Sequence, residues 1–314
     1  MFKQVLMTLV ALGLCVGAAR AGEAGTLAVR PGMAPQQAKM LLRMEARSQA
    51  LRRAWLAAGH VAPDAAPAIT AGKVVKTDLN PIKAPAAPEI TVTFQAPAGL
   101  AHIGACFSSS TASQEICFQE VLPPGPTPPT AGNATIEQPG GEGGTLSLYA
   151  APGAWSLTDL YIIDASGAAT AYNPGQIASL FTGGSTFQVT NNGTPDTADP
   201  VITAAKVLTP VVRLSSPNPA FGAQLTVSDN LSGVGEICID VMDPHGNEYS
   251  CGYDVPSSPR SGAVDTGTSI AGGSAGTWTI YDYDVCDVAG NCVYDANPSD
   301  IQSLFGTTTF KVKN

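Results

Sequence analysis

The residues best suited to chemistry in this 314-residue chain are one serine in a glycine-rich pentapeptide, several cysteines and many carboxylates. The pentapeptide Gly272-Gly273-Ser274-Ala275-Gly276 fits the GxSxG pattern of serine hydrolases. That pattern needs a strand before the nucleophile, a helix after it, and Asp and His further along the chain. Here a predicted strand begins near Trp278, after the pentapeptide, and no histidine follows Ser274. We therefore interpret the pentapeptide as a structural loop and expect no enzymatic activity.

The carboxylates are concentrated in the C-terminal part of the chain. Carboxylates and carbonyl oxygens in loops are ligands for Ca²⁺, and Asp229, Asn230, Asp287 and Asn291 are predicted to lie in loops. No complete Asp-x-Asp-x-Asp-Gly calcium loop is present. Because Asp and Asn also stabilise turns by bonding their own backbone, we expect no cofactor and no metal ligand, with structural calcium as the alternative.

The N-terminus has the pattern of an export signal. Lys3 precedes an apolar run from residue 5 to 19, and Ala19-Arg20-Ala21 offers small residues for cleavage. We expect residues 1–21 to be a signal peptide and the mature protein to be periplasmic, cell-surface or extracellular. No later stretch reaches the 18 apolar residues of a membrane span.

Six of the seven cysteines lie after the predicted signal: Cys106, Cys117, Cys238, Cys251, Cys286 and Cys292. An even number of cysteines in an exported protein predicts disulfides. A zinc site is disfavoured, because no CxxC pair occurs and no histidine lies near a cysteine pair at ligand spacing.

Charge is divided unevenly along the chain. Residues 22–66 carry six basic and three acidic side chains, a net charge of +3, whereas residues 67–314 carry 8 basic and 22 acidic ones, a net charge of −14. The acidic balance argues against a nucleic-acid partner, which requires a basic face.

A basic amphipathic helix is predicted between Met33 and Gly59, ahead of a linker that ends at residue 66. Its candidate interaction residues are Leu41, Met44, Leu51 and Trp55 on the apolar stripe, with Arg43 and Arg47 on the basic side. Three interpretations stay open: packing on a domain of the same chain, self-association or binding to a partner protein, and adsorption to anionic lipid or an envelope polymer.

The rest of the chain is an internal repeat. The segment 67–74 matches 200–207, and Trp155 and Trp278 each lie 36 residues before an asparagine, Asn191 and Asn314. With the matching cysteine pairs between them, these make three anchors in one order, which divide the chain into copies at 67–193 and 194–314. Cys106 with Cys117 and Cys238 with Cys251 occupy equivalent positions, so we expect each pair to be bonded within its copy.

Both copies are predicted to be all-β. Apolar and polar residues alternate in segments such as Ile90–Gln95, and glycine- and aspartate-rich turns separate these segments. Many short strands over this length predict a two-sheet antiparallel sandwich. Cys286 and Cys292 flank one turn and are expected to bridge it, and Trp155 and Trp278 are expected in the cores.

The segments Asp229–Val234, Gly276–Ile280 and Asp287–Asn291 resemble bacterial immunoglobulin-like domains, which occur in tandem on secreted and cell-surface proteins. The resemblance covers both copies and implies two tandem Ig-like sandwiches preceded by the amphipathic helix. It also implies a role in adhesion or protein interaction, with a protein or an envelope polymer as the partner. The alternative is a carbohydrate-binding or accessory module that acts with a separate secreted enzyme.

Overall fold

The computed structural model describes residues 48–49, 51–61, 65–83, 86–121, 128–136, 145–249, 253–255 and 258–314. The predicted signal peptide, Leu41, Met44, Arg43, Arg47 and Cys251 lie outside these residues. The chain divides at Asp196 into an N-terminal unit, which ends at Pro195, and a C-terminal unit, Asp196–Asn314.

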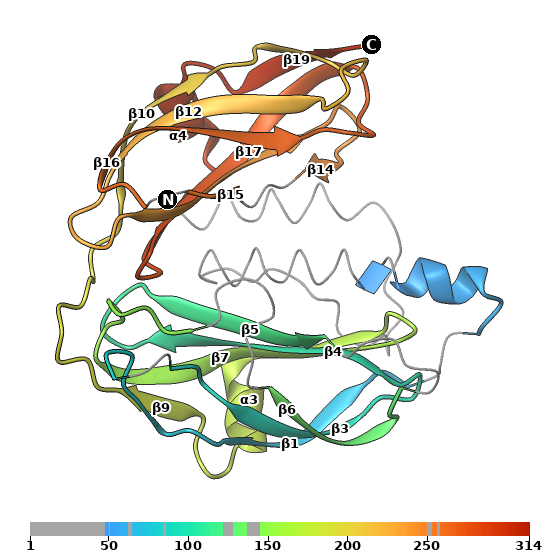
Figure 1. The fold of residues 1–314 in the computed structure, drawn as a ribbon. Coiled ribbons are helices and arrows are strands. Elements are labelled where there is room, and N and C mark those ends of the chain that lie inside the picture. The colour runs from blue at the N-terminus through green and yellow to red at the C-terminus, as the bar shows by residue number, and fades with distance from the viewer. Residues whose placement is uncertain are drawn as a thin grey trace. The chain divides into compact units, whose positions relative to one another are not determined.

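The N-terminal unit is a sandwich of two sheets (Figure 1). The smaller sheet has the order β1-β3-β6, formed by β1 (Ala68–Val74), β3 (Ile90–Gln95) and β6 (Ala131–Ile136). The larger has the order β2-β9-β7-β4-β5, formed by β2 (Asp78–Leu79), β9 (Thr186–Val189), β7 (Gly153–Asp164), β4 (Leu100–Ser109) and β5 (Glu115–Val121). An additional strand, β8 (Ala169–Tyr172), pairs with β7.

The C-terminal unit repeats this arrangement, with one additional short strand in its larger sheet. Its smaller sheet has the order β10-β12-β16, formed by β10 (Val201–Val207), β12 (Ala220–Ser228) and β16 (Ser261–Ser269). Its larger sheet has the order β11-β19-β17-β13-β14, formed by β11 (Val211–Arg213), β19 (Thr309–Lys313), β17 (Gly276–Asp287), β13 (Val234–Met242) and β14 (Glu248–Tyr249). Off this path, β15 (Tyr253–Asp254) pairs with β13, and β18 (Cys292–Asp295) pairs with β17. The prediction of two tandem two-sheet sandwiches is confirmed.

One pairing in each unit differs from the antiparallel prediction. The short second strand of each unit pairs in parallel with the last strand: β2 with β9, and β11 with β19. The chain leaves the smaller sheet after its first strand and joins the far edge of the larger sheet, where it runs alongside the last strand.

Each unit also contains one short helix that the strand patterning does not predict. Helix α3 (Pro174–Leu180) begins at Asn173 with a capping box, and α4 (Pro298–Phe305) begins at Asn297. Proline in the first turn and an asparagine cap satisfy the free N–H groups at a helix start. The repeated Asn-Pro dipeptide is the sequence signal for both helices.

The two cores are separate clusters built on equivalent tryptophans. Trp155 and Trp278 are 1% and 0% exposed, and each indole Nε1 donates to the carbonyl four residues earlier, Ala151 at 3.0 Å and Ser274 at 2.8 Å. Alternating residues of β3 and β12 pack inward around them. A buried indole whose N–H is satisfied gains the full benefit of apolar burial.

Because each unit has its own core, we expect the substitutions Trp155→Ala and Trp278→Ala to act on different unfolding transitions. Each should lower the free energy of unfolding of its own unit by about 3–5 kcal/mol, through loss of apolar burial and the cavity left behind. Differential scanning calorimetry of the full chain measures both transitions. Equal shifts of both transitions by either substitution would contradict separate cores.

Candidate functional site

The structure brings Ser274 together with a histidine and an aspartate that precede it in the sequence. The Oγ of Ser274 lies 3.1 Å from the Nδ1 of His245 and 3.1 Å from the Oδ2 of Asp243. Asp243 and His245 belong to the turn between β13 and β14, and Ser274 belongs to the loop before β17. The GxSxG pattern predicts a histidine after the serine, whereas His245 precedes Ser274, so the motif does not predict this group.

The geometry of this group is not that of a catalytic triad. In a triad, one ring nitrogen of the histidine faces the serine and the other faces the carboxylate. Here the Nδ1 of His245 faces both, since it also lies 3.6 Å from Asp243, and Ser274 donates directly to the carboxylate. The His245 side chain is 70% exposed. The group therefore lacks the relay through histidine that activates a serine.

Asp243 acts as the centre of a turn. Its Oδ1 accepts the backbone N–H groups of His245 (2.8 Å) and Asn247 (2.9 Å), and its Oδ2 accepts the side-chain amide of Asn247 (3.0 Å) and the Ser274 hydroxyl. Burial raises the pKa of Asp243, but hydrogen bonds from Asn247, His245 and Ser274 outweigh it and lower the pKa to about 2. Such a carboxylate is a poor base at neutral pH and a strong structural acceptor.

We expect Asp243→Ala to lower the free energy of unfolding of the C-terminal unit by about 2 kcal/mol, because the variant loses charge-assisted hydrogen bonds. The lowered pKa means that the carboxylate stabilises the folded state above the usual value of 3.8 and loses this effect as the pH falls toward about 2. Urea unfolding between these pH values measures the difference between the wild type and the variant. The control is Asp265→Ala, at an exposed residue that accepts one bond from Gln224; a matching loss in the control would contradict a special role for Asp243.

The larger sheet of the N-terminal unit has an apolar outer face, which a helix contacts. Tyr161 and Ile163 are buried on this face, and Leu51 packs against them from the helical residues 51–57. The Oγ of Ser48 donates to the carbonyl of Gly167 at 2.5 Å. The backbone at Ser48 lies so close to Gly167 that a Cβ at Gly167 would be 2.2 Å from the Ser48 carbonyl oxygen.

This contact supports the first of the three interpretations of the basic helix, for the described residues from 48 onward. Trp55 is half-buried, and its Nε1 donates to the carbonyl of Val61 at 3.0 Å while its ring contacts His60. Leu41, Met44, Arg43 and Arg47 lie outside the described residues. Their proposed roles in interaction stay predictions.

The packing of Leu51 predicts that Leu51→Asp lowers the free energy of unfolding of the N-terminal unit by about 1–3 kcal/mol, because a charge would replace an apolar contact. Leu56→Asp is the matched control, since Leu56 is 52% exposed. Calorimetry of the full chain separates the two effects. Equal effects of the two substitutions would show that the helix does not pack on this face.

The equivalent face of the C-terminal unit carries acidic side chains instead. In the repeat, Tyr161 corresponds to Asp284 and Ile163 to Cys286, and Asp240 lies opposite Asp282 in the sheet register. Burial, followed by the charges of Asp240 and Glu248, raises the pKa of Asp282, whose carboxylate also accepts the Tyr294 hydroxyl at 3.1 Å. The same sandwich thus presents an apolar sheet face in one unit and an acidic one in the other.

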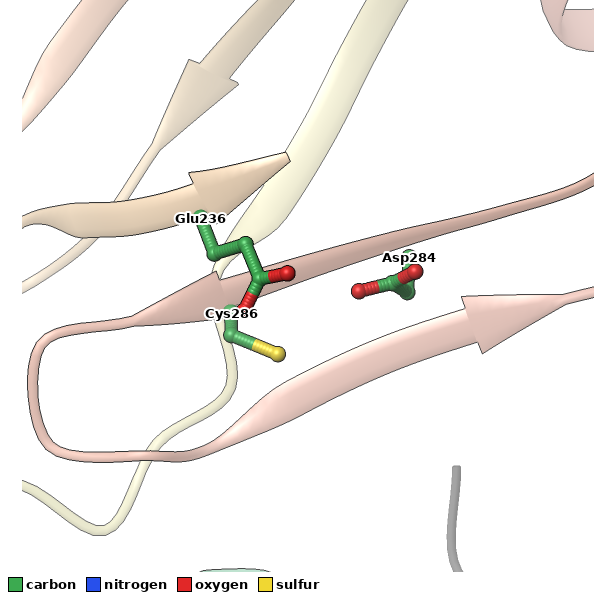
Figure 2. Close-up of side chains that lie close together, drawn as sticks. All are labelled: Glu236, Asp284 and Cys286. Atoms are coloured by element: carbon green, nitrogen blue, oxygen red, sulfur yellow. The ribbon is translucent and has the colours of Figure 1, made fainter. Parts of the chain in front are cut away.

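Glu236, Asp284 and Cys286 lie together on this acidic face, on the neighbouring strands β13 and β17 (Figure 2). A cysteine thiolate binds transition metals such as Zn²⁺, and a carboxylate can supply a further ligand. However, Cys286 is joined to Cys292 in a disulfide, so it cannot supply the thiolate that a metal requires. This group is therefore a disulfide flanked by two carboxylates.

The structure contains two of the expected disulfides, Cys106–Cys117 and Cys286–Cys292. Each joins directly opposed residues of two adjacent strands. Disulfides indicate an oxidising, extracytoplasmic compartment. The pairing of Cys238 with Cys251 stays a prediction, because Cys251 lies outside the described residues.

Three further carboxylates meet at one end of the C-terminal unit, those of Asp196, Asp229 and Asp287. One oxygen of each lies within 4.8 Å of the others. Burial and the charges of Asp196 and Asp229 outweigh the hydrogen bonds from Asn291 and raise the pKa of Asp287 to about 6. Asp229, Asp287 and Asn291 are among the loop residues predicted from the sequence, whereas no sequence signal marks Asp196, which lies near the start of the second copy. Asn230, selected with them, is exposed.

Comparison with known proteins adds little to this description. No family model matches the chain, and no curated protein matches it. Among solved structures, one of CBD12 from CALX1.2 matches 79% of this chain and 99% of that chain, with 11% identity and a TM-score of 0.17. Among the described residues, no helix has the length and apolar character needed to cross a membrane.

Proposed function

We propose that this chain is an exported, non-enzymatic protein whose tandem Ig-like sandwiches mediate adhesion or protein interaction at the cell surface or outside the cell. The observation that carries the proposal is the succession of two sandwiches with the same strand order, each with a disulfide between adjacent strands. Tandem modules of one fold present binding surfaces along a chain and gain avidity when they engage together.

The strand order supports the Ig-like assignment. In the N-terminal unit, β1, β3 and β6 occupy the places of strands A, B and E of an Ig-like sandwich, and β4, β7 and β9 those of C, F and G. The C-terminal unit follows the same order. The disulfides differ from those of antibody domains, since they join neighbouring strands of one sheet rather than the two sheets.

Two electrostatic and chemical observations support interaction rather than catalysis. The net charge of −14 over residues 67–314 favours association with basic surfaces. The Ser274 group, which has the residue types of a hydrolase, has the hydrogen-bond pattern of a turn. A protein or an envelope polymer is the partner class that we propose.

The test is binding of the purified mature protein to envelope protein extracts and to a polysaccharide array, with cross-linking and mass spectrometry to identify the partner. We expect saturable binding to an envelope component that weakens several-fold when the salt rises from about 0.05 M to about 0.5 M. Hydrolysis of ester, peptide or glycoside substrates that is lost in Ser274→Ala would overturn the proposal.

Binding restricted to polysaccharides would instead favour the accessory-module function. In that case Tyr294→Ala should abolish binding, because Tyr294 is an exposed tyrosine of the C-terminal unit at 42% exposure. Tyr283 is unsuitable for this test because it belongs to the core.

A further inference from the structure

The carboxylates of Asp196, Asp229 and Asp287 come from three separate segments. Asp196 is the first residue of the C-terminal unit, Asp229 follows β12, and Asp287 ends β17. The three residues are 1%, 9% and 4% exposed. Burying three carboxylates at this spacing is unfavourable unless a positive charge compensates them.

Hydrogen bonds from backbone and amide N–H groups orient these carboxylates. Asp229 Oδ2 accepts from the backbone N–H groups of Leu231 and Gly233, both at 2.7 Å, and Asp196 Oδ2 accepts from the Ser232 N–H at 2.8 Å. Asp287 accepts from the backbone and the side-chain amide of Asn291, at 2.8 and 2.7 Å. In the part of the chain that the structure describes, no lysine or arginine forms an ion pair with Asp229 or Asp287.

Buried oxygen atoms around the carboxylates lack hydrogen-bond donors. They are Asp229 Oδ1, Ser232 Oγ and Asn291 Oδ1. Ser232 and Asn291 are 8% and 0% exposed, and both contact the cluster directly: Ser232 through its N–H to Asp196, and Asn291 through its amide to Asp287 and to the Asp196 carbonyl. Buried polar atoms without partners are rare and costly, so their presence here points to a missing positive ligand.

We propose that Asp196, Asp229 and Asp287 bind a Ca²⁺ ion, with the Ser232 hydroxyl and the Asn291 amide oxygen as neutral ligands. The donor set consists of oxygen atoms from carboxylate, hydroxyl and amide groups, which is the hard ligand type that Ca²⁺ prefers. Zn²⁺ and Cu²⁺ favour nitrogen or sulfur ligands, and none of these residues supplies one. Ca²⁺ also tolerates irregular geometry better than Mg²⁺, which requires a near-ideal octahedron.

The N-terminal unit provides an internal comparison. By strand register, Ala96 stands at the place of Asp229, and by the repeat Ala168 stands at the place of Asn291. Asp164, the counterpart of Asp287, bonds instead to the Ser166 hydroxyl at 2.6 Å and to the N–H groups of Ser166 and Ala168 at 3.0 Å. In the N-terminal unit a single carboxylate, that of Asp164, stabilises a turn at the place of the three-carboxylate cluster. The proposed Ca²⁺ site therefore belongs to the C-terminal unit.

Isothermal titration of the chelator-treated full chain with CaCl₂ tests the proposal. We expect one ion per chain, at least tenfold weaker binding of Mg²⁺, and loss of at least tenfold in Ca²⁺ affinity in Asp229→Asn. Asp265→Asn, at an exposed carboxylate of the same unit, is the matched control and should bind as the wild type does. No heat of binding at about 10 mM Ca²⁺, above the 10⁻⁴–10⁻³ M dissociation constants of extracellular calcium modules, would overturn the proposal.

A second measurement locates the ion even if Asp229→Asn fails to fold. In the wild type, saturating Ca²⁺ should raise the Tm of the C-terminal unit by about 5–10 °C and leave that of the N-terminal unit unchanged. Hydrogen exchange should slow at residues 229–233 and 287–291. Binding with no protection of these segments, or equal stabilisation of both units, would place the ion elsewhere and refute the site.

Discussion

Each sandwich depends on one buried indole whose N–H bonds to the carbonyl four residues earlier. This bond fixes the loop that leads into the longest strand of each unit, β7 or β17. In the C-terminal unit the loop is the glycine-rich pentapeptide, and a Cβ at Gly273 would lie 2.5 Å from the Trp278 ring. The glycine allows the indole to pack against the loop backbone. The hydroxyl of Ser274 also bonds to Asp243 and His245, which holds the same loop in place. The pentapeptide with the pattern of a hydrolase nucleophile therefore serves to position the core tryptophan.

The two units show how one fold carries different surfaces. Their inner faces are equivalent because both must bury a core against the smaller sheet. Their outer faces are free of that constraint, and they have diverged: Tyr161 and Ile163 in one copy correspond to Asp284 and Cys286 in the other. The apolar version is covered by a helix of the same chain, while both larger sheets are cross-linked by a disulfide between adjacent strands.

The sequence was most informative where a signal repeats or alternates. The matched tryptophans and cysteines fixed the two copies, and alternation in segments such as Ile90–Gln95 predicted the buried face. The sequence was least informative where distant segments meet, because nothing local records that Asp196 approaches Asp229 and Asp287, or that His245 approaches Ser274. The helices α3 and α4 were missed because they are too short for a periodic pattern, and only the Asn-Pro start marks them.

The parallel pairing at the edge of each larger sheet has a mechanical consequence. The strand near the start of each unit, β2 or β11, lies alongside the last strand, β9 or β19, and runs in the same direction. Once the first strand, β1 or β10, has separated from the smaller sheet, a tension on the two ends of a unit pulls β2 and β9, or β11 and β19, in opposite directions along their length. The inter-strand hydrogen bonds are then loaded together in shear, rather than opened one after another as in a peeled hairpin. The parallel pair in each unit therefore opposes extension along the chain by shear.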